Sequence, residues 1–572
     1  MSRLDHQLDL ARLDLWLRSN CFDHRANNEN EFQLELICTF LLTSKVGLLY
    51  NLLILKLNYC SYLKELPSSL HKLTKLRCLE FEDTQVTKMP MHFGELKNLQ
   101  VLSTFYVIRN NEVVSIKQLG RLNLHGRLSI SELQNIENPL DALEVNLKNK
   151  HLVELKLIWN SNHIPDDPRK EEKVLENLQP SDQLAHLLIR SYCGTQFPSW
   201  VFDNSLSNLV SLELIDCKYC LCLPPLGLLS SLKTLKIRGF DGIVSIGAEF
   251  YGSNSSSFKS LESLEFSKMK EWEEWECKTT SFPRLRYLGI WQCPMLKSLS
   301  EQLLHLKELS IESCDNLIIS EHREDTSALE RLTIHSSPLV NIPMTHYDFI
   351  EDMTIGNACD SLIIFQLKFF PMLRSLRLER CQNIQRISQE HAHNHLEILS
   401  ICACPQFESF PDEGLSVAFP FLIELSIKNC PKVEKFPYEG LPSKVKFMSL
   451  SSIKLIASLG ETLNVNTCLQ SLSINSLDVE SFPDEVLLPP SITSLKITNC
   501  PNLKQLDYKL LYHLSSLSLW NCPNLQCLPE EGLPKSISSL LIWDCPLLKQ
   551  RCQNPEGKDW RKIAHLEYLR IG

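Results

Sequence analysis

The stretch LSSLSLWNCPNLQCLP (514–529) decides the fold, because the same pattern is written again on both sides of it. SITSLKITNCPNLKQL (491–506) precedes it and SISSLLIWDCPLLKQ (536–550) follows it, with the apolar residues at equivalent places. The cysteines Cys500, Cys522 and Cys545 mark the period, which is 22 and then 23 residues. A constant period of this length indicates that each copy is one structural unit of a repeating array.

Within each copy the apolar residues follow the pattern L-x-x-L-x-L-x-x-C-x-x-L, which is that of a leucine-rich repeat. Leu517 and Leu519 are two positions apart, so on a strand both side chains point into one core while Ser518 and Trp520 point to the other side. One unit cannot bury its leucines alone, but stacked units form a parallel ladder with a continuous core. We therefore expect an α/β solenoid: a leucine-rich-repeat horseshoe with a parallel β-sheet on the concave face and mostly loops or short helices on the convex face.

The repeat begins near Leu52 and continues through almost the whole chain, with roughly twenty copies in all. We expect three parts: an atypical N-terminal leader or partial cap at 1–45, the solenoid at 46–550, and a charged C-terminal capping tail at 551–572. The run DDPRKEEKVLENLQP (166–180) has a proline followed by helix formers, and it predicts a helix on the convex side.

Composition favours a protein of a reducing compartment that neither binds nucleic acid nor spans a membrane. The net charge is −10 over 572 residues, which gives no basic footprint for nucleic acid. The N-terminus has no signal-peptide core, and the apolar stretch 37–57 is interrupted by Lys45, Asn51 and Lys56, so no membrane span is expected. Ten of the 22 cysteines stand where the chain leaves a strand, and we interpret them as structural thiols of a cytoplasmic protein. These ten are Cys60, Cys217, Cys293, Cys314, Cys381, Cys404, Cys430, Cys500, Cys522 and Cys545.

Aromatic residues at outward strand positions are the candidate partner-binding residues. Trp520 and Trp543 occupy equivalent places in consecutive units, so they should lie side by side, about 5 Å apart. Tyr287 and Trp291 lie on the same face of an earlier strand. Exposed aromatic residues on a concave sheet are expected anchors for a protein partner. The alternative is that tryptophans in one column stack on each other and shield the sheet.

Signals for catalysis or metal binding are weak. His391, His393 and His395 alternate as metal ligands might, but a loop between two repeats explains them equally well and no cysteine pair completes a site. No nucleophile–base arrangement is readable. We expect no enzyme activity, no metal and no cofactor.

Several long phrases resemble one known family. They are FPSWV (197–201), LCLPPLGLLSSLKTLKIRGFDGIVSIGAEFYG (221–252), LESLEFSKMKEWEEW (261–275) and CPLLKQRCQNPEGKDWRKIAH (545–565). Together with the repeats they make residues 46–568 similar to the leucine-rich-repeat region of plant intracellular nucleotide-binding leucine-rich-repeat disease resistance proteins of the coiled-coil class. The family's nucleotide-binding module is not readable here, because the sequence has no G-x-x-x-x-G-K-[ST] phosphate loop.

The resemblance implies a protein-recognition module of a plant innate immune receptor. Its partner would be a pathogen effector or a modified host protein, with a nucleotide-binding module possible in another chain. Two alternatives remain: a substrate-selecting adaptor of a ubiquitin ligase, which would need an F-box-like helical segment in 1–45, and a non-functional receptor fragment.

Overall fold

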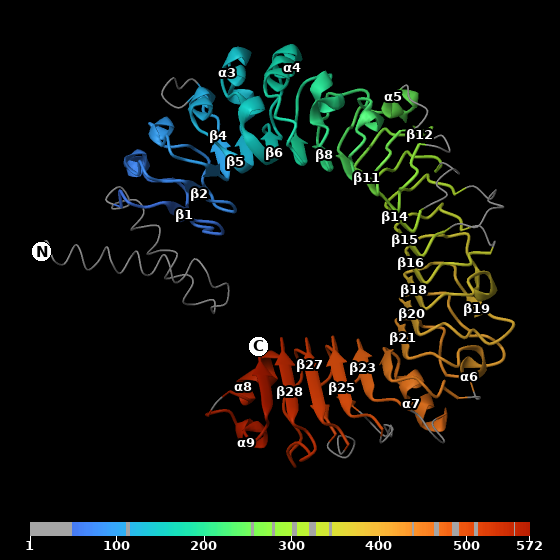
Figure 1. The fold of residues 1–572 in the computed structure, drawn as a ribbon. Helices are drawn as coiled ribbons and strands as arrows, with labels where there is room; N and C mark the ends of the chain where they lie inside the picture. The colour runs from blue at the N-terminus through green and yellow to red at the C-terminus, as the bar shows by residue number, and fades with distance from the viewer. Residues whose placement is uncertain are drawn as a thin grey trace, which may run out of the picture. The chain divides into compact units, whose positions relative to one another are not determined.

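A computed structural model describes twelve stretches of the chain (Figure 1): residues 49–109, 115–252, 257–276, 281–299, 306–319, 328–342, 346–437, 440–462, 468–482, 491–507, 513–553 and 555–572. The expected leader at 1–45 lies outside these ranges. The chain divides into two compact units, Met1–Pro294 (unit 1) and Met295–Gly572 (unit 2), and each is described by itself.

Unit 1 is built on parallel strands that follow one another in chain order (Figure 1). The first three, β1 (Ile54–Lys56), β2 (Cys78–Glu80) and β3 (Val101–Leu102), form a small parallel sheet. A longer parallel ladder then contains β4 (Thr104–Tyr106), β5 (His125–Ser131), β6 (His151–Ile158), β7 (His186–Arg190), β8 (Ser211–Ile215), β9 (Thr234–Arg238), β11 (Ser263–Ser267) and β13 (Tyr287–Trp291). The short pair β10 (Ser245–Ile246) and β12 (Glu274–Trp275) lies in the return segments between ladder strands.

Unit 2 continues the same plan with strands of almost constant length. Its ladder contains β14 (Glu308–Glu312), β15 (Arg331–His335), β16 (Asp352–Gly356), β18 (Ser375–Glu379), β20 (Ile398–Cys402), β21 (Glu424–Lys428), β22 (Phe447–Leu450), β23 (Ser471–Asn475), β25 (Ser494–Thr498), β27 (Ser516–Trp520), β28 (Ser539–Trp543) and β29 (Tyr568–Ile571). Two short pairs lie in the returns, β17 (Ile364–Gln366) with β19 (Arg386–Ser388) and β24 (Ser481–Phe482) with β26 (Gln505–Leu506).

The leucines at the second and fourth positions of each strand form the core. Leu517 pairs in register with Leu495 on one side and Leu540 on the other, and all three side chains are buried. Burying one leucine contributes about 2 kcal/mol, and each side chain also contacts the equivalent leucine of its neighbours. The fold is therefore a leucine-rich-repeat solenoid with a parallel sheet, as the spacing predicts.

Most ladder strands are followed by a residue with left-handed backbone geometry, which the sequence pattern does not show directly. At the end of β27, Asn521 has φ of 50° and its amide still donates to Trp543 O of the next strand at 2.9 Å. Cys522 then turns inward. In unit 2 the equivalent residues are Ser313, Ser336, Asn357, Arg380, Ala403, Asn429, Ser476, Asn499, Asn521 and Asp544, with φ between 47° and 57°. Asparagine and aspartate tolerate this region better than other side chains, which explains their frequency at this position.

The ten cysteines at the strand exits are thiols rather than disulfides, as predicted, and nine of them are buried while Cys60 is only partly buried. Their sulfur atoms lie near backbone carbonyls of their own and the preceding repeat: Cys381 Sγ is 3.4 Å from Ile355 O, and Cys430 Sγ is 3.6 Å from Ile401 O. Burial raises the pKa of Cys217, and hydrogen bonding to Cys404 together with burial raises that of Cys381. The Cys217 and Cys381 thiols therefore stay protonated and serve as weak donors inside the solenoid.

The return segments are mostly loops and single helical turns, and Figure 1 shows the unit 1 helices on the outer side of the ladder. The α-helices are α3 (Pro139–Leu143), α4 (Pro168–Asn177), α5 (Ala248–Tyr251), α6 (Leu415–Ala418), α7 (Ile453–Thr462), α8 (Pro546–Arg551) and α9 (Trp560–Ile563). The 3₁₀ helices are η2 (Ser68–Lys72), η3 (Phe93–Glu95), η5 (Ile116–Arg121), η6 (Leu133–Asn135), η7 (Leu147–Asn149), η8 (Ser199–Val201), η9 (Asn204–Leu206), η10 (Leu226–Leu228) and η11 (Leu367–Phe369). The helix predicted at 166–180 is confirmed as α4, where Asp167 caps the amide of Arg169 and Pro168 occupies the first turn.

Residues 551–572 contribute α9 and β29, and β29 extends the ladder by pairing with β28. Asp559 anchors this segment: its side chain is buried and forms ion pairs with Arg551 at 2.8 Å and Lys562 at 3.0 Å. Its role as a cap, like the other expected domain boundaries, stays a prediction.

Ala403 tests the cost of the left-handed strand exit. Its φ is 53°, and glycine lacks the Cβ that disfavours this conformation, so Ala403→Gly should stabilise the fold by about 0.5–1 kcal/mol. The measurement is hydrogen exchange of the β20 and β21 amides in the full chain.

The matched control is Ala418→Gly at the end of α6, where the backbone is helical. There the replacement of alanine by glycine should destabilise the fold by about 0.5–1 kcal/mol. A loss of protection in Ala403→Gly equal to that of the control would contradict the argument.

Candidate protein-binding surface

The candidate site is the face of each ladder that the core does not use. In a five-residue strand the first, third and fifth side chains point away from the leucines, and in β27 these are Ser516, Ser518 and Trp520. Because β25, β27 and β28 are parallel and in register, equivalent outward residues form columns that run across the ladder. Such columns present a broad surface whose side chains can vary without disturbing the core.

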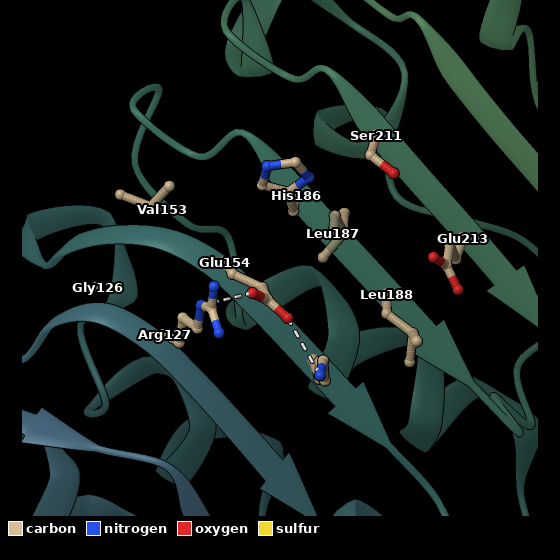
Figure 2. Close-up of a pocket in the computed structure, with 10 residues that line it drawn as sticks. Gly126, Arg127, Val153, Glu154, His186, Leu187, Leu188, Ser211 and Glu213 are labelled. Atoms are coloured by element: carbon tan, nitrogen blue, oxygen red, sulfur yellow. Dashed lines mark ion pairs between the residues drawn. The ribbon is translucent and has the colours of Figure 1, made fainter. Parts of the chain in front are cut away.

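In unit 1 this face contains a hollow of about 410 Å³ over β5 to β8 (Figure 2). It is lined by Gly126, Arg127, Val153, Glu154, Lys156, His186, Leu187, Leu188, Ser211 and Glu213. The strands β5 and β6 have 7 and 8 residues, longer than the five of β7 and β8. The register of β5 on β6 also shifts between Gly126 and Arg127, and Gly126 has φ of 80°. Sequence reasoning missed the hollow because strand length and this shift are not visible in the leucine spacing.

The hollow combines charged and apolar groups. Arg127 and Lys156 both form ion pairs of 3.1 Å with the mostly buried Glu154, as the dashed lines in Figure 2 show. Glu213 stands on the opposite side, on β8, and Leu188 lies between them on β7. The arrangement suits a partner that offers both an apolar group and charges of either sign.

In unit 2 the two predicted tryptophans lie side by side. Trp520 and Trp543 are register partners, their ring centroids are 5.9 Å apart, and their planes are inclined by 27°. The Lys496 ammonium lies 5.2 Å from the Trp520 ring, and backbone at Gly572 packs against Trp543. The rings nevertheless remain 37% and 54% exposed. The pair therefore shields the strands beneath it and also presents apolar surface, so stacking and partner contact are compatible.

Tyr287 and Trp291 flank Gly289 on β13 and are both half-buried. A Cβ at Gly289 would lie 2.9 Å from Tyr287 Oη and 2.9 Å from Trp291 Cζ2, so both rings lean over the glycine. They belong to unit 1 and the tryptophan pair belongs to unit 2, so we treat them as separate surfaces. A partner-binding role for any of the four residues stays a prediction.

Comparison with known proteins agrees with this architecture. Residues 116–240 match the family model described as R13L1/DRL21 LRRs, and residues 182–315 match that of plant disease resistance protein RPS2-like leucine-rich repeats. The chain is 35% identical over 319 residues to disease resistance RPP13-like protein 1 of Arabidopsis thaliana, covering 50% of this chain and 30% of that protein. It is 32% identical over 244 residues to disease resistance protein RGA2 of Solanum bulbocastanum, covering 41% of this chain and 23% of that protein.

The repeats of this chain are therefore similar to the leucine-rich repeats of plant disease resistance proteins. The chain spans less than a third of the length of these relatives. Among solved structures, the crystal structure of a TLR13–ssRNA13 complex is similar with a TM-score of 0.53 and 19% identity, over 90% of this chain and 73% of that one. At this identity the likeness concerns the fold alone.

One of the three alternating histidines, His393, has a structural explanation. His393 is buried, its Nε2 donates to Phe370 O at 2.9 Å, and its Nδ1 accepts from the Leu396 amide at 3.2 Å. Both ring nitrogens are thus used by backbone groups, which leaves neither for a metal. Within the described part of the chain, no group of three or more histidine, cysteine or acidic side chains is arranged to hold a metal ion.

One buried cluster in the repeat region has the residue types of a nucleophile site. Glu171 accepts from the Trp159 indole at 2.7 Å and lies 3.7 Å from His163 Nε2, and the nearby Cys193 Sγ is 3.9 Å from His163 O. Burial raises the pKa of Cys193 to about 11, so the thiol stays protonated at neutral pH. A protonated, buried thiol is a poor nucleophile.

Among the helices of the described ranges, none combines the length and hydropathy that crossing a bilayer requires.

His393 should make the stability of the repeat region depend on pH. Burial lowers the pKa of His393, because it disfavours the charged form of the ring. Protonation at Nδ1 would also remove the acceptor of the Leu396 amide. The unfolded chain, with a histidine pKa of about 6.5, therefore takes up a proton first, and stability is lost as pH falls below that value. His393→Gln, which does not titrate, should lose less stability than the native chain between pH 7 and pH 5.5 in urea denaturation.

The control is His391→Gln, an exposed neighbour in the same loop. It should keep the native pH dependence. If both variants followed the native curve, His393 would not be a source of the acid sensitivity.

Proposed function

We propose that the chain is the protein-recognition region of a plant innate immune receptor, and that the outward face of its ladders binds a pathogen effector or a modified host protein. The observation that carries the proposal is the exposed, stacked pair Trp520 and Trp543 on a sheet face that the core does not use. Large aromatic residues at the surface are typical anchors of protein interfaces. The named relatives are disease resistance proteins, which supports the defence context.

Binding without catalysis accounts for the chemistry of the described residues. The hollow in unit 1 holds Glu154 in ion pairs with two cations, and the buried Cys193 thiol is protonated. These groups suit recognition rather than bond making, because a nucleophile needs activation by a neighbouring base or a lowered pKa. We therefore assign no turnover to this chain.

The proposed setting is the plant cytoplasm. The exit cysteines are thiols rather than disulfides, and nine of the ten are buried, which fits a reducing compartment. There the region would work together with a nucleotide-binding module, since the family that the sequence resembles joins the two. We propose that this module belongs either to the same protein or to another chain.

A panel of secreted pathogen proteins and host targets, co-expressed in leaves with the full chain, tests the proposal. Candidate partners are measured by co-purification and then by titration. Removing a central aromatic anchor typically costs 2 kcal/mol or more, so Trp520→Ala with Trp543→Ala, or Leu188→Glu in the hollow, should weaken binding by at least about tenfold.

The matched controls make substitutions of the same kind, aromatic to alanine and aliphatic to glutamate, in the return segments. Phe349→Ala replaces an aromatic residue that is 52% exposed, and Ile164→Glu places a carboxylate at a residue that is 78% exposed. Both should bind as the native chain does. The proposal fails if no partner is found, or if every partner found binds the face variants and the controls equally.

A further inference from the structure

The last five strands of unit 2 have an unusual outward face, which we call the serine–tryptophan face. It consists of the outward side chains of β23, β25, β27, β28 and β29, all within the described part of the chain. These positions contain no aspartate or glutamate. Most are serine, threonine or asparagine, and the others are Lys496, Trp520, Leu541, Trp543, Tyr568 and Arg570.

This composition differs from the rest of the ladder and of the chain. Outward carboxylates occur earlier in unit 2, at Glu308, Glu312, Asp352, Glu379 and Glu424, and the whole chain carries a net charge of −10. A face with two cations and no carboxylate is therefore a local reversal of the overall charge. Asp544, one residue beyond Trp543 at the strand exit, borders the face on one side.

Both cations lie over aromatic rings. Lys496 Nζ is 5.2 Å from the centroid of the Trp520 ring, and the Arg570 guanidinium is 5.3 Å from that of Tyr568. Neither forms an ion pair within the described residues, whereas Lys236, on an outward position of unit 1, pairs with Glu265 at 3.2 Å. A ring holds a cation in place without neutralising it, so both charges remain available to a partner.

The aromatic rings of the serine–tryptophan face also remain exposed to solvent. Trp543 and Tyr568 are 54% and 43% exposed on adjacent strands, with the partly buried Leu541 between their columns. Stacking fixes the tryptophan planes, so little side-chain entropy is lost when a partner covers their edges. Ordered aromatic edges beside uncompensated cations favour a ligand that is both apolar and anionic.

We propose that the serine–tryptophan face binds an acidic, extended segment of a protein partner, with a large apolar side chain of that segment on the Trp520–Trp543 edges and its carboxylates on Lys496 and Arg570. This inference rests on the proposed function and names the chemistry of the partner. A nucleic acid is the less suitable anion, because tight binding to a phosphate backbone uses many cations and this face offers two.

Selection from a library of random 12-residue peptides on the intact chain tests the inference. The enriched peptides should carry a net negative charge and at least one aromatic residue or leucine. A synthetic representative should bind at least tenfold more weakly to Lys496→Glu with Arg570→Glu and to Trp520→Ala with Trp543→Ala, and severalfold more weakly in 300 mM than in 50 mM salt. Circular dichroism confirms that each variant is folded.

The matched control is Lys535→Glu with Lys549→Glu, on the return segments of the same repeats, which changes the net charge by the same amount. It should bind the peptide as the native chain does. Neutral or basic enriched peptides, no enrichment, equal losses in the control, or preferential binding of a single-stranded oligonucleotide would each overturn the inference. A partner bound through the hollow of unit 1 would then still support the proposed function, which separates the two failures.

Discussion

The structure depends on one constraint: two leucines spaced two residues apart on a short strand can be buried only by the same two leucines of the neighbouring units. Leu517 and Leu519 lie in register with Leu540 and Ile542, and both members of each pair are buried. The parallel ladder follows because each chain segment must return to start the next strand in the same direction. Core, register and repeat length are therefore consequences of one pattern.

The strand exit requires an unfavourable backbone conformation in this repeat. In most units the chain leaves the sheet through a left-handed residue followed by a buried cysteine or its equivalent. Asn521 and Cys522 have different roles at the exit of β27. The Asn521 amide donates to Trp543 O, and the Cys522 thiol is buried in the core. Because a buried neutral thiol is small and a weak donor, it fits a position surrounded by backbone carbonyls.

Function, in contrast, resides in the side chains that the core does not constrain. The outward positions differ between the two surfaces described: charges of both signs around Leu188 in unit 1, and serines, tryptophans and unpaired cations in unit 2. Of the three alternating histidines, His393 bonds two backbone groups through its ring nitrogens. A polar residue that points into the solenoid thus serves the fold, and one that points out is available for recognition.

The sequence by itself determined the repeat, the strands and the direction of their side chains, because periods of two and of about 22 residues follow from strand geometry and unit length. It also placed Trp520 and Trp543 beside each other, since register makes equivalent positions neighbours. Only the tertiary structure decided that the rings stay exposed although stacked, that Lys496 and Arg570 lie over rings rather than in ion pairs, and that a hollow opens over β5 to β8. These features depend on strand length, on the shift at Gly126 and on side-chain contacts between units, none of which is encoded in the spacing of the leucines.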